Sequence, residues 1–315
     1  MALIKREPVT DVAESVHALY RDRQGDWQRD HLGASMIGNK CDRYLWLSFR
    51  WAAKPEHEGR MLRLFERGHR EEEWLIDGLR QAGFTVTGEQ LRVSEGHIGG
   101  SLDGVISGLV EDPEEEHVLE LKTSNAKQWE RLRVSGVRSV KPVHYVQMQI
   151  YMHKLGLKHA LYVSVCKDND EIYTERVAYS KRTAEKHLER ARAVIAAEQP
   201  PERLDANFAP CVLVSRDGTR WPCQFYENCH GTKMPERNCR TCVSSCNGNK
   251  RESGEKVWTC HVGDMVRILS PEEQREGCHS QVSIPDIVNG EVAYVSLEKR
   301  EVTYQFSDGT KATER

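Results

Sequence analysis

The sequence predicts an α/β protein with a mixed central sheet flanked by helices, and a small cysteine-rich, metal-stapled module near its carboxyl end. Apolar runs of strand length, bounded by turn residues, predict the sheet. Longer segments with apolar residues at helical spacing lie between those runs and predict the helices. Beyond Pro201 the hydrophobic periodicity fades while eight of the ten cysteines follow, which predicts the module.

Length and composition limit the possibilities further. The 315 residues suit one large domain with a small appendage, and a net charge of −3 gives no bulk attraction to nucleic acid. No apolar run approaches the ~20 residues that span a bilayer, and the opening residues lack the apolar core of a signal peptide. We therefore expect a cytoplasmic protein without membrane contact. Reduced thiols there favour metal sites over disulfides.

The chain before the central stretch predicts helices and one strand pair. Apolar residues at helical spacing predict an amphipathic helix within residues 10–30, and a second helix carries Tyr44 and Leu47. A long helix runs from Met61 to Leu79. Residues 83–87 and 91–93 are then expected to form a first strand pair.

The stretch from Gly99 to Lys122 carries the predicted chemistry. Two strand-like runs flank an acidic, proline-containing turn, so the chain is expected to form a hairpin that brings Asp103 close to Glu120. Side chains alternate along a strand, so Glu120 and Lys122 point the same way. Two carboxylates beside an amine predict a Mg²⁺ or Mn²⁺ site in which Lys122 assists a water nucleophile.

Two helices follow the hairpin. The first has Ser124 or Asn125 as its expected cap and is rich in basic residues, which predicts a phosphate-binding track with one aromatic residue for stacking. The residues of this track are Lys127, Trp129, Arg131, Arg133, Arg138 and Lys141. The second helix begins near Pro142 and places Gln147 and Tyr151 on one face, four residues apart.

The remaining chain completes the sheet and forms the module. Residues 160–166 and 171–177 are expected to form a closing hairpin, a helix spans 182–198, and residues 290–306 form a terminal hairpin. The C-x-x-C knuckle suits tetrahedral zinc, and the expected zinc ligands are Cys239, Cys242, Cys260 and Cys278. For the fourth ligand Cys246, His261 and His279 are the alternatives to Cys278.

Taken together, Asp103, Glu120-Leu121-Lys122 and the Gln-x-x-x-Tyr pair resemble the PD-(D/E)xK nuclease superfamily. Within it the chain is similar to the RecB-type branch, which includes the iron–sulfur nucleases of CRISPR adaptation, and especially to its phage-encoded members. The likeness covers residues 30–290. It implies a restriction-endonuclease-like fold in which His69 and the Leu121 carbonyl join Asp103 and Glu120 around the metal. Glu72, one turn after His69, is expected to support the imidazole or approach the metal.

The resemblance also implies a 4Fe–4S cluster held by one early cysteine and three late ones. The residues that match are Cys41, Cys211, Cys223 and Cys229. The family's late cysteines usually include a close C-x-x-C pair, whereas here Tyr226 stands three residues after Cys223. Zinc, or no metal, is therefore the alternative at this site.

These features predict a four-part chain with the function of a DNA nuclease. The parts are a helical extension (1–30), the nuclease domain (31–235), the zinc module (236–290) and the terminal hairpin (291–315). We expect an exonuclease acting on single strands or DNA ends in phage recombination or replication, with DNA and proteins of those processes as partners. The alternatives are a junction-resolvase-like endonuclease and a zinc-stapled DNA-binding protein that does not cleave.

Overall fold

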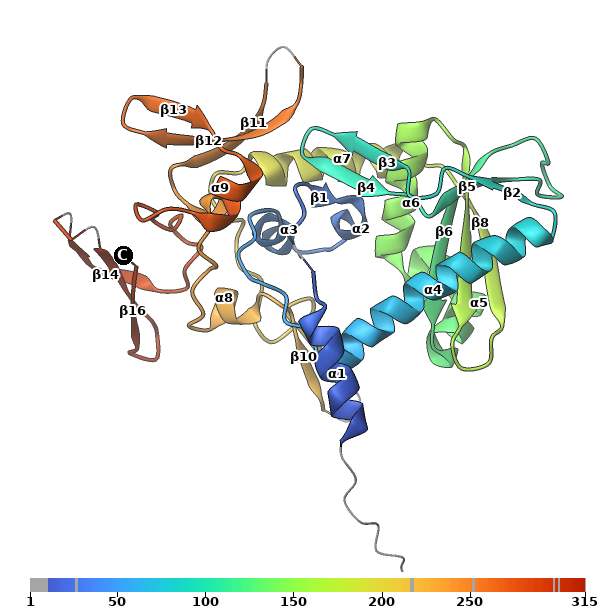
Figure 1. The fold of residues 1–315 in the computed structure, drawn as a ribbon, viewed down its shortest axis with the longest axis horizontal. Coiled ribbons are helices and arrows are strands. Elements are labelled where there is room, and N and C mark those ends of the chain that lie inside the picture. The colour runs from blue at the N-terminus through green and yellow to red at the C-terminus, as the bar shows by residue number, and fades with distance from the viewer. Residues whose placement is uncertain are drawn as a thin grey trace, which may run out of the picture.

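A five-stranded mixed sheet forms the centre of the computed structural model (Figure 1). The structure describes residues 11–25, 28–215, 218–250, 253–296, 298–299 and 301–314. The first ten residues of the predicted amino-terminal extension therefore lie outside the described residues. The strand order is β2-β5-β6-β7-β8, and only the β6–β7 pair is parallel. The strands are β2 (Thr85–Thr87), β5 (Gly104–Ser107), β6 (His117–Ser124), β7 (His159–Cys166) and β8 (Ile172–Ala178).

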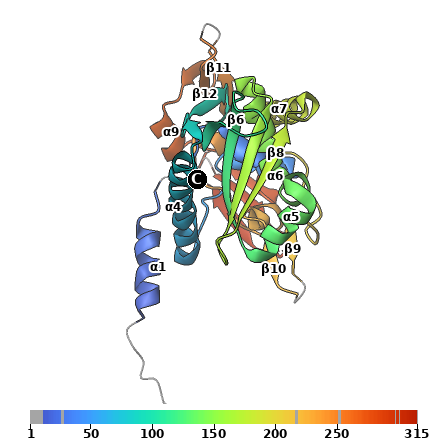
Figure 2. The same ribbon diagram turned by 90° about the vertical axis from the view of Figure 1, so that its right-hand side faces the viewer.

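Helices cover both faces of this sheet, which confirms the predicted α/β class. Figure 2 shows α4 (Gly59–Gln81) on one side and α5 (Ala126–Val140) with α6 (Pro142–Leu155) on the other. Leu119 and Leu121 of β6 pack toward α4, in a cluster with Ile76. The alternate residue Val118 belongs to the larger cluster that contains α6. One strand therefore faces two apolar layers, as its period of two requires.

The segment that was expected to be one strand through Asp103 is two strands in two sheets. β4 (Ile98–Ser101) pairs with β1 (Leu32–Gly33) and β3 (Arg92–Glu95), whereas β5 joins the central sheet. The prediction that residues 83–87 and 91–93 pair with each other is therefore wrong, since β2 pairs with β5 and β3 with β4. The chain changes sheet at Leu102 and Asp103, so this bend carries the first of the two expected carboxylates.

The buried helix α6 begins and ends where its sequence predicts. Pro142 occupies its first turn, where a missing N–H costs nothing, and Gly156 ends it in the left-handed conformation at φ 71°. All seven residues from Val146 to Met152 are buried. A helix enclosed on every side must satisfy its polar groups internally, so the partners of Gln147 carry information about function.

The remaining helices are α1 (Val12–Asp22), α2 (Ala34–Ile37), α3 (Asp42–Phe49), α7 (Lys181–Ala196), α8 (Tyr226–His230) and α9 (Pro271–Glu276). Of these, α2, α3 and α7 lie around the small satellite sheet and α6, α1 packs on α4, and α8 and α9 belong to the carboxyl part (Figure 1). Asn125 caps α5 as predicted, because its Oδ1 accepts a hydrogen bond of 2.9 Å from the backbone N–H of Gln128. Among the described residues no helix is long and apolar enough to cross a membrane.

Small antiparallel sheets build the carboxyl part. Their strands are β9 (Val212–Val214) with β10 (Arg220–Pro222), β11 (Ser245–Asn249) with β12 (Lys256–Val262) and β13 (Met265–Ile268), and β14 (Glu291–Ser296) with β15 (Glu301–Gln305) and β16 (Lys311–Glu314). The predicted terminal hairpin thus has a third strand. Among the described residues, the 3₁₀ turn η1 (Cys239–Thr241) contains most of the C-x-x-C knuckle.

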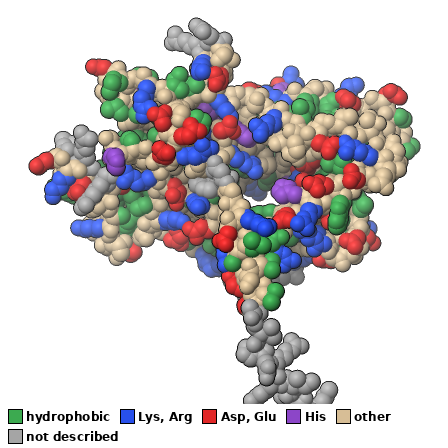
Figure 3. Space-filling model, in the orientation of Figure 1, with side chains coloured by type: hydrophobic (Ala, Val, Ile, Leu, Met, Phe, Trp, Pro, Cys, Tyr) green, Lys and Arg blue, Asp and Glu red, His purple; other side chains and the backbone are tan. Residues whose placement is uncertain are grey.

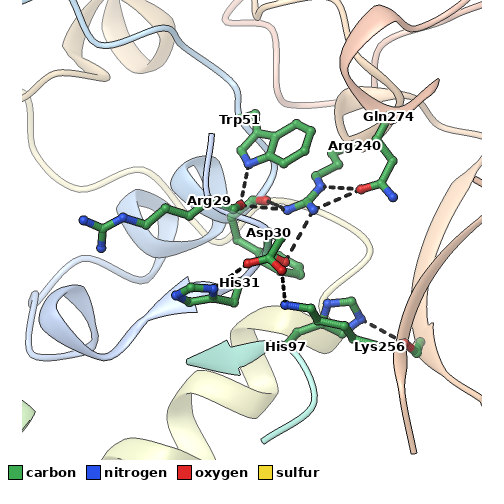
Figure 4. Close-up of polar contacts among 10 residues, drawn as sticks. Arg29, Asp30, His31, Trp51, His97, Arg240, Lys256 and Gln274 are labelled. Atoms are coloured by element: carbon green, nitrogen blue, oxygen red, sulfur yellow. Dashed lines mark hydrogen bonds and ion pairs between the residues drawn. The ribbon is translucent and has the colours of Figure 1, made fainter. Parts of the chain in front are cut away.

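One buried arginine ties this part to the rest of the chain (Figure 4). Arg240 is 2% exposed, and its guanidinium lies 3.6 Å from the centroid of the Trp51 ring. It donates hydrogen bonds to the Phe49 carbonyl at 3.1 Å and to Gln274 Oε1 at 3.0 Å. No carboxylate among the described residues forms an ion pair with it, and burial lowers its pKa to about 9. Backbone oxygens and the Gln274 amide oxygen, rather than an acid, therefore hold this charge.

A second set of contacts lies beside Arg240 in the same view. The Asp30 carboxylate binds Lys256 Nζ at 2.5 Å and His31 Nδ1 at 2.6 Å (Figure 4). The His97 ring is 5% exposed, and its Nε2 lies 2.9 Å from the Gly248 carbonyl. The Asp30–Lys256 and His97–Gly248 contacts each join residues more than 150 positions apart, so the cysteine-rich part packs against the amino-terminal part here.

Candidate active site

The bend between β4 and β5 places Asp103 against β6. Gly104 of β5 pairs with Leu119, which sets the preceding residue beside the middle of the neighbouring strand. Asp103 Oδ2 accepts a hydrogen bond of 2.8 Å from the Leu121 backbone N–H. The two expected acids therefore lie at one place on the sheet, as the hairpin predicted.

The amine of Lys122 lies at the centre of this group. Its Nζ is 2.7 Å from Glu120 Oε1, 3.3 Å from Asp103 Oδ2 and 2.7 Å from the Leu121 carbonyl oxygen. The neighbouring carboxylates raise the pKa of Lys122 despite burial, so the amine is an ammonium ion. Three oxygens expected to bind a metal thus already surround one positive charge.

Glu120 is fully buried, which is unusual for a carboxylate. Burial, with a smaller contribution from Asp103, raises its pKa from 4.5 to about 7 although Lys122 opposes the shift. Gln147 Nε2 donates to Oε2 at 3.1 Å, whereas Oε1 has the Lys122 ion pair and no partner in hydrogen-bond geometry. The Lys122 ammonium, 2.7 Å away, is thus the neighbour that balances the charge on Oε1.

Tyr151 acts on the backbone rather than on the open side of the site. Its hydroxyl donates to the Ser101 carbonyl at 2.8 Å, two residues before Asp103. A Cβ at Gly100 would come within 2.4 Å of that hydroxyl, so only glycine allows this approach. Tyr151 therefore holds the backbone before Asp103 in position.

Helix α4 brings a third carboxylate to the site. Glu72 is half-buried, and its pKa is raised first by burial and then by the charge of Asp103. The His69 side chain is 77% exposed, and its Nδ1 lies 3.7 Å from Glu72 Oε2. His69 therefore reaches Asp103 and Glu120 only through Glu72. Glu72 was expected near the metal from the sequence, but it was not one of the expected ligands.

The basic residues predicted to bind DNA do not share one face of α5. Arg133 forms an ion pair with Glu130 at 2.7 Å, and the Arg138 guanidinium lies 5.5 Å from the centroid of the Tyr145 ring. Trp129 is half-buried, with a buried indole nitrogen. These three residues of the expected track are therefore engaged within the protein.

Lys141 and Arg131 lie together instead, on the side of the active site. Charge repulsion from Arg131 and Lys167 lowers the pKa of Lys141 beyond the effect of burial. Burial, followed by the charges of Lys122 and Lys141, lowers the pKa of His144 to about 3. Cations thus gather next to the carboxylates, while Lys127 at the start of α5 is exposed.

The structure brings both expected cysteine groups together. Burial, followed by the charges of neighbouring thiolates that include Cys41, raises the pKa of Cys211, Cys223 and Cys229, and that of Cys223 reaches about 11. A cavity of about 180 Å³ is lined by three of these cysteines, namely Cys41, Cys211 and Cys223.

The second group meets in the module. Burial raises the pKa of Cys239 to about 11, with further contributions from Cys242, Cys278 and Cys260. All eight cysteines lie among the described residues. In each of the two groups, no three sulfurs lie within 4.8 Å of one another. Cys239 Sγ also donates to the Glu273 carbonyl at 3.2 Å.

Among the described residues, one group of three side chains that was not predicted from the sequence has its ligand atoms within 4.8 Å of one another. Ligand atoms of Glu115, His117 and His159 all lie within 4.8 Å of one another at the start of β6 and β7. Arg176 donates to His117 Nε2 at 2.9 Å and to Glu115 Oε2 at 2.7 Å. A guanidinium therefore already supplies the positive charge here, on the face of the sheet turned toward α4.

Comparison with known proteins gives limited information. No protein-family model and no curated protein matches the chain. Among solved structures, the chain is similar to an alkaline exonuclease from Laribacter hongkongensis, with a TM-score of 0.41, 17% identity, and coverage of 58% of this chain and 91% of that one. It is also similar to a phage-related exonuclease from Haemophilus somnus 129PT, with a TM-score of 0.31, 17% identity, and coverage of 39% and 65%. At TM-scores of 0.41 and 0.31 these likenesses carry no argument about function.

Proposed function

We propose that this protein is a Mg²⁺- or Mn²⁺-dependent deoxyribonuclease that hydrolyses phosphodiester bonds. The observation that carries the proposal is the convergence of Asp103 and Glu120 on Lys122 at distances of 3.3 and 2.7 Å. A purely structural ion pair would not need a second and third acid around one ammonium ion. Burying Glu120 without exposed area is costly, and such cost is common where a charge has a functional use.

The donors fit a hard divalent cation. Carboxylates of Asp103, Glu120 and Glu72 and the Leu121 carbonyl offer only oxygen, which suits Mg²⁺ or Mn²⁺ better than a soft metal. His69 would join the ligands from the outside of the site or hold Glu72 in place.

Each side chain then has a definite task. A bound divalent ion would acidify water and offset the charge of the scissile phosphate. Lys122 would orient the attacking water and stabilise negative charge on the phosphate. Gln147 fixes the rotamer of Glu120 through its 3.1 Å hydrogen bond, and Tyr151 fixes the backbone before Asp103. Lys141 and Arg131, with Lys127, would contact the phosphates of the DNA strand.

The cysteine groups support two further metal proposals. Four cysteines from distant parts of the chain meet beside a cavity, which fits a 4Fe–4S cluster at Cys41, Cys211, Cys223 and Cys229. At the second group we propose structural zinc bound by Cys239, Cys242, Cys260 and Cys278; since no three of these sulfurs lie within 4.8 Å of one another, they would have to move closer together to bind one ion. Buried thiols with raised pKa values are unfavourable as thiolates unless a cation compensates them. Both metals would be structural and take no part in hydrolysis.

We propose an exonuclease acting on single strands or DNA ends in the cytoplasm, in phage recombination or replication. Purified protein with Mg²⁺ should degrade end-labelled linear DNA, and chelation with EDTA should stop the reaction. Lys122→Ala should lower the cleavage rate by at least about 100-fold, since electrostatic groups of this kind contribute about that much. Lys181→Ala, an exposed lysine on α7, should cleave at the wild-type rate.

The substrates distinguish the alternatives. Release of mononucleotides from linear DNA, with circular DNA left intact, would support an exonuclease. Cutting of circular or branched DNA would replace it with an endonuclease. Binding without cleavage, or activity that survives Lys122→Ala, would remove the catalytic assignment.

A further inference from the structure

The outer face of α4 carries a row of arginines that the active site does not use. Arg60, Arg63, Arg67 and Arg70 alternate spacings of three and four residues, and Trp74 continues the row. Such spacing places side chains on one face of a helix. The row extends over fourteen residues, or about 21 Å at the α-helical rise. Figure 3 shows Lys and Arg side chains along α4, near the place where α1 meets it.

This row lines a groove of about 740 Å³, which we call the α4 groove. Its other walls include Tyr20 of α1 and Val165, Asp170 and Ile172 at the ends of β7 and β8. The Trp74 side chain in it is 71% exposed. The groove therefore presents aromatic surface and positive charge together, on the flank of α4 turned away from Glu72 and His69.

Most of these charges are available to an anion. Arg70 pairs with Glu66 one turn before it, and Arg67 donates to the Lys167 carbonyl at 3.3 Å. Arg60 and Arg63 have no acidic partner among the residues that the structure describes. Three acids, Glu66, Glu71 and Asp170, also line the groove. The attraction of the groove for an anion therefore depends on the arginine row and not on a uniformly positive wall.

A path of cations connects the α4 groove to the active site. The charge of Arg67 lowers the pKa of Lys167, and Lys167 in turn lowers the pKa of Lys141, each after the effect of burial. Lys141 and Lys122 both act on His144 beside the carboxylates. Cations that repel one another at close range gain free energy when a polyanion passes over them.

We propose that the α4 groove binds single-stranded nucleic acid that continues from the active site across Lys167, an inference that rests on the proposed nuclease function. The arginines contact successive phosphates, and Trp74 stacks on an unpaired base. Single strands fit because their bases are free to stack, whereas an acidic peptide or a lipid surface would leave Trp74 without a planar partner. The groove would hold the strand beyond the cleaved bond.

Binding is measured by fluorescence anisotropy in EDTA, so that cleavage does not interfere. The probe is a labelled oligothymidylate of about 20 nucleotides, longer than typical single-strand sites of about 4 to 16 nucleotides. Trp74→Ala should weaken binding about fivefold to about 150-fold, the equivalent of one lost base stack. The double variant Arg63→Ala with Arg67→Ala should reduce the slope of log K against log salt by about 1.4.

The matched control removes two exposed charges elsewhere, as Lys181→Ala with Arg182→Ala on α7. This control should bind like the wild type, and all variants should keep the wild-type urea midpoint. Unchanged binding in both α4 variants would overturn the inference, even if the protein cleaves DNA. Loss of binding in those variants would support it, even in a preparation that shows no cleavage. Equal α4-dependent binding of polyglutamate or anionic phosphatidylglycerol vesicles would also overturn it.

Discussion

Replacing Glu120 by glutamine should abolish cleavage and yet make the protein more stable at alkaline pH. The change keeps the shape of the side chain, so Gln147 and Lys122 keep a polar neighbour. It removes a carboxylate whose pKa is raised from 4.5 to about 7, chiefly by burial. Catalysis is lost because an amide is a poor ligand for a divalent ion compared with a carboxylate.

The size of the gain follows from the shift in pKa. Between pH 4.5 and about 7 the folded protein holds more protons at Glu120 than the unfolded chain does, so its free energy of unfolding falls as pH rises through this window. Without metal, ionised Glu120 then costs about 3 kcal/mol at about pH 8 and less than about 1 kcal/mol at about pH 5. Glu120→Gln resembles the protonated form, so it avoids this cost.

Urea unfolding in EDTA at the two pH values measures the difference. Glu120→Gln should exceed the wild type by about 3 kcal/mol near pH 8, and the two proteins should converge near pH 5. Asp103→Asn is a useful comparison, because this more exposed acid accepts the Leu121 N–H and should not gain in the same way. A variant that is less stable than the wild type at both pH values would refute the account of Glu120 as a strained, buried charge.

Three other predictions concern the packing and the cysteines. His97, whose pKa burial lowers to about 4, stays neutral in the fold while the unfolded chain gains a proton below pH 6.5, so lowering the pH from about 7 to about 5 should cost about 2 kcal/mol. His97→Gln should lose that part of the acid sensitivity in urea unfolding, and an unchanged pH dependence would count against it. Arg240→Ala should destabilise the protein by more than about 3 kcal/mol, since it leaves several buried carbonyls without donors; a urea midpoint near the wild type would contradict this. Cys239→Ser should lower the zinc content measured by mass spectrometry while the visible absorbance of an iron–sulfur cluster remains, and joint loss of both would mean that the grouping is wrong.

The central acids were predictable because local rules decide their positions. Alternation along β6 sends Glu120 and Lys122 to one side, and a hairpin must return Asp103 to the neighbouring strand. Gln147 followed from helical spacing on α6. None of these inferences required knowledge of distant contacts.

Other features depend on how separate elements meet, and the sequence alone did not show them. His117 and His159 become neighbours only through the parallel register of β6 and β7. The split between β4 and β5 was missed because a glycine-rich run has no side-chain pattern to mark a change of sheet.

Arg240 occupies one of the two positions between Cys239 and Cys242, and its guanidinium reaches Phe49 and Trp51. A shortened version of the protein that ended near residue 235 would therefore not be a smaller protein with an intact surface. It would leave an aromatic socket open to water and several backbone oxygens without donors, a surface that invites aggregation. Deletion experiments on this protein would then report on solubility before they reported on activity.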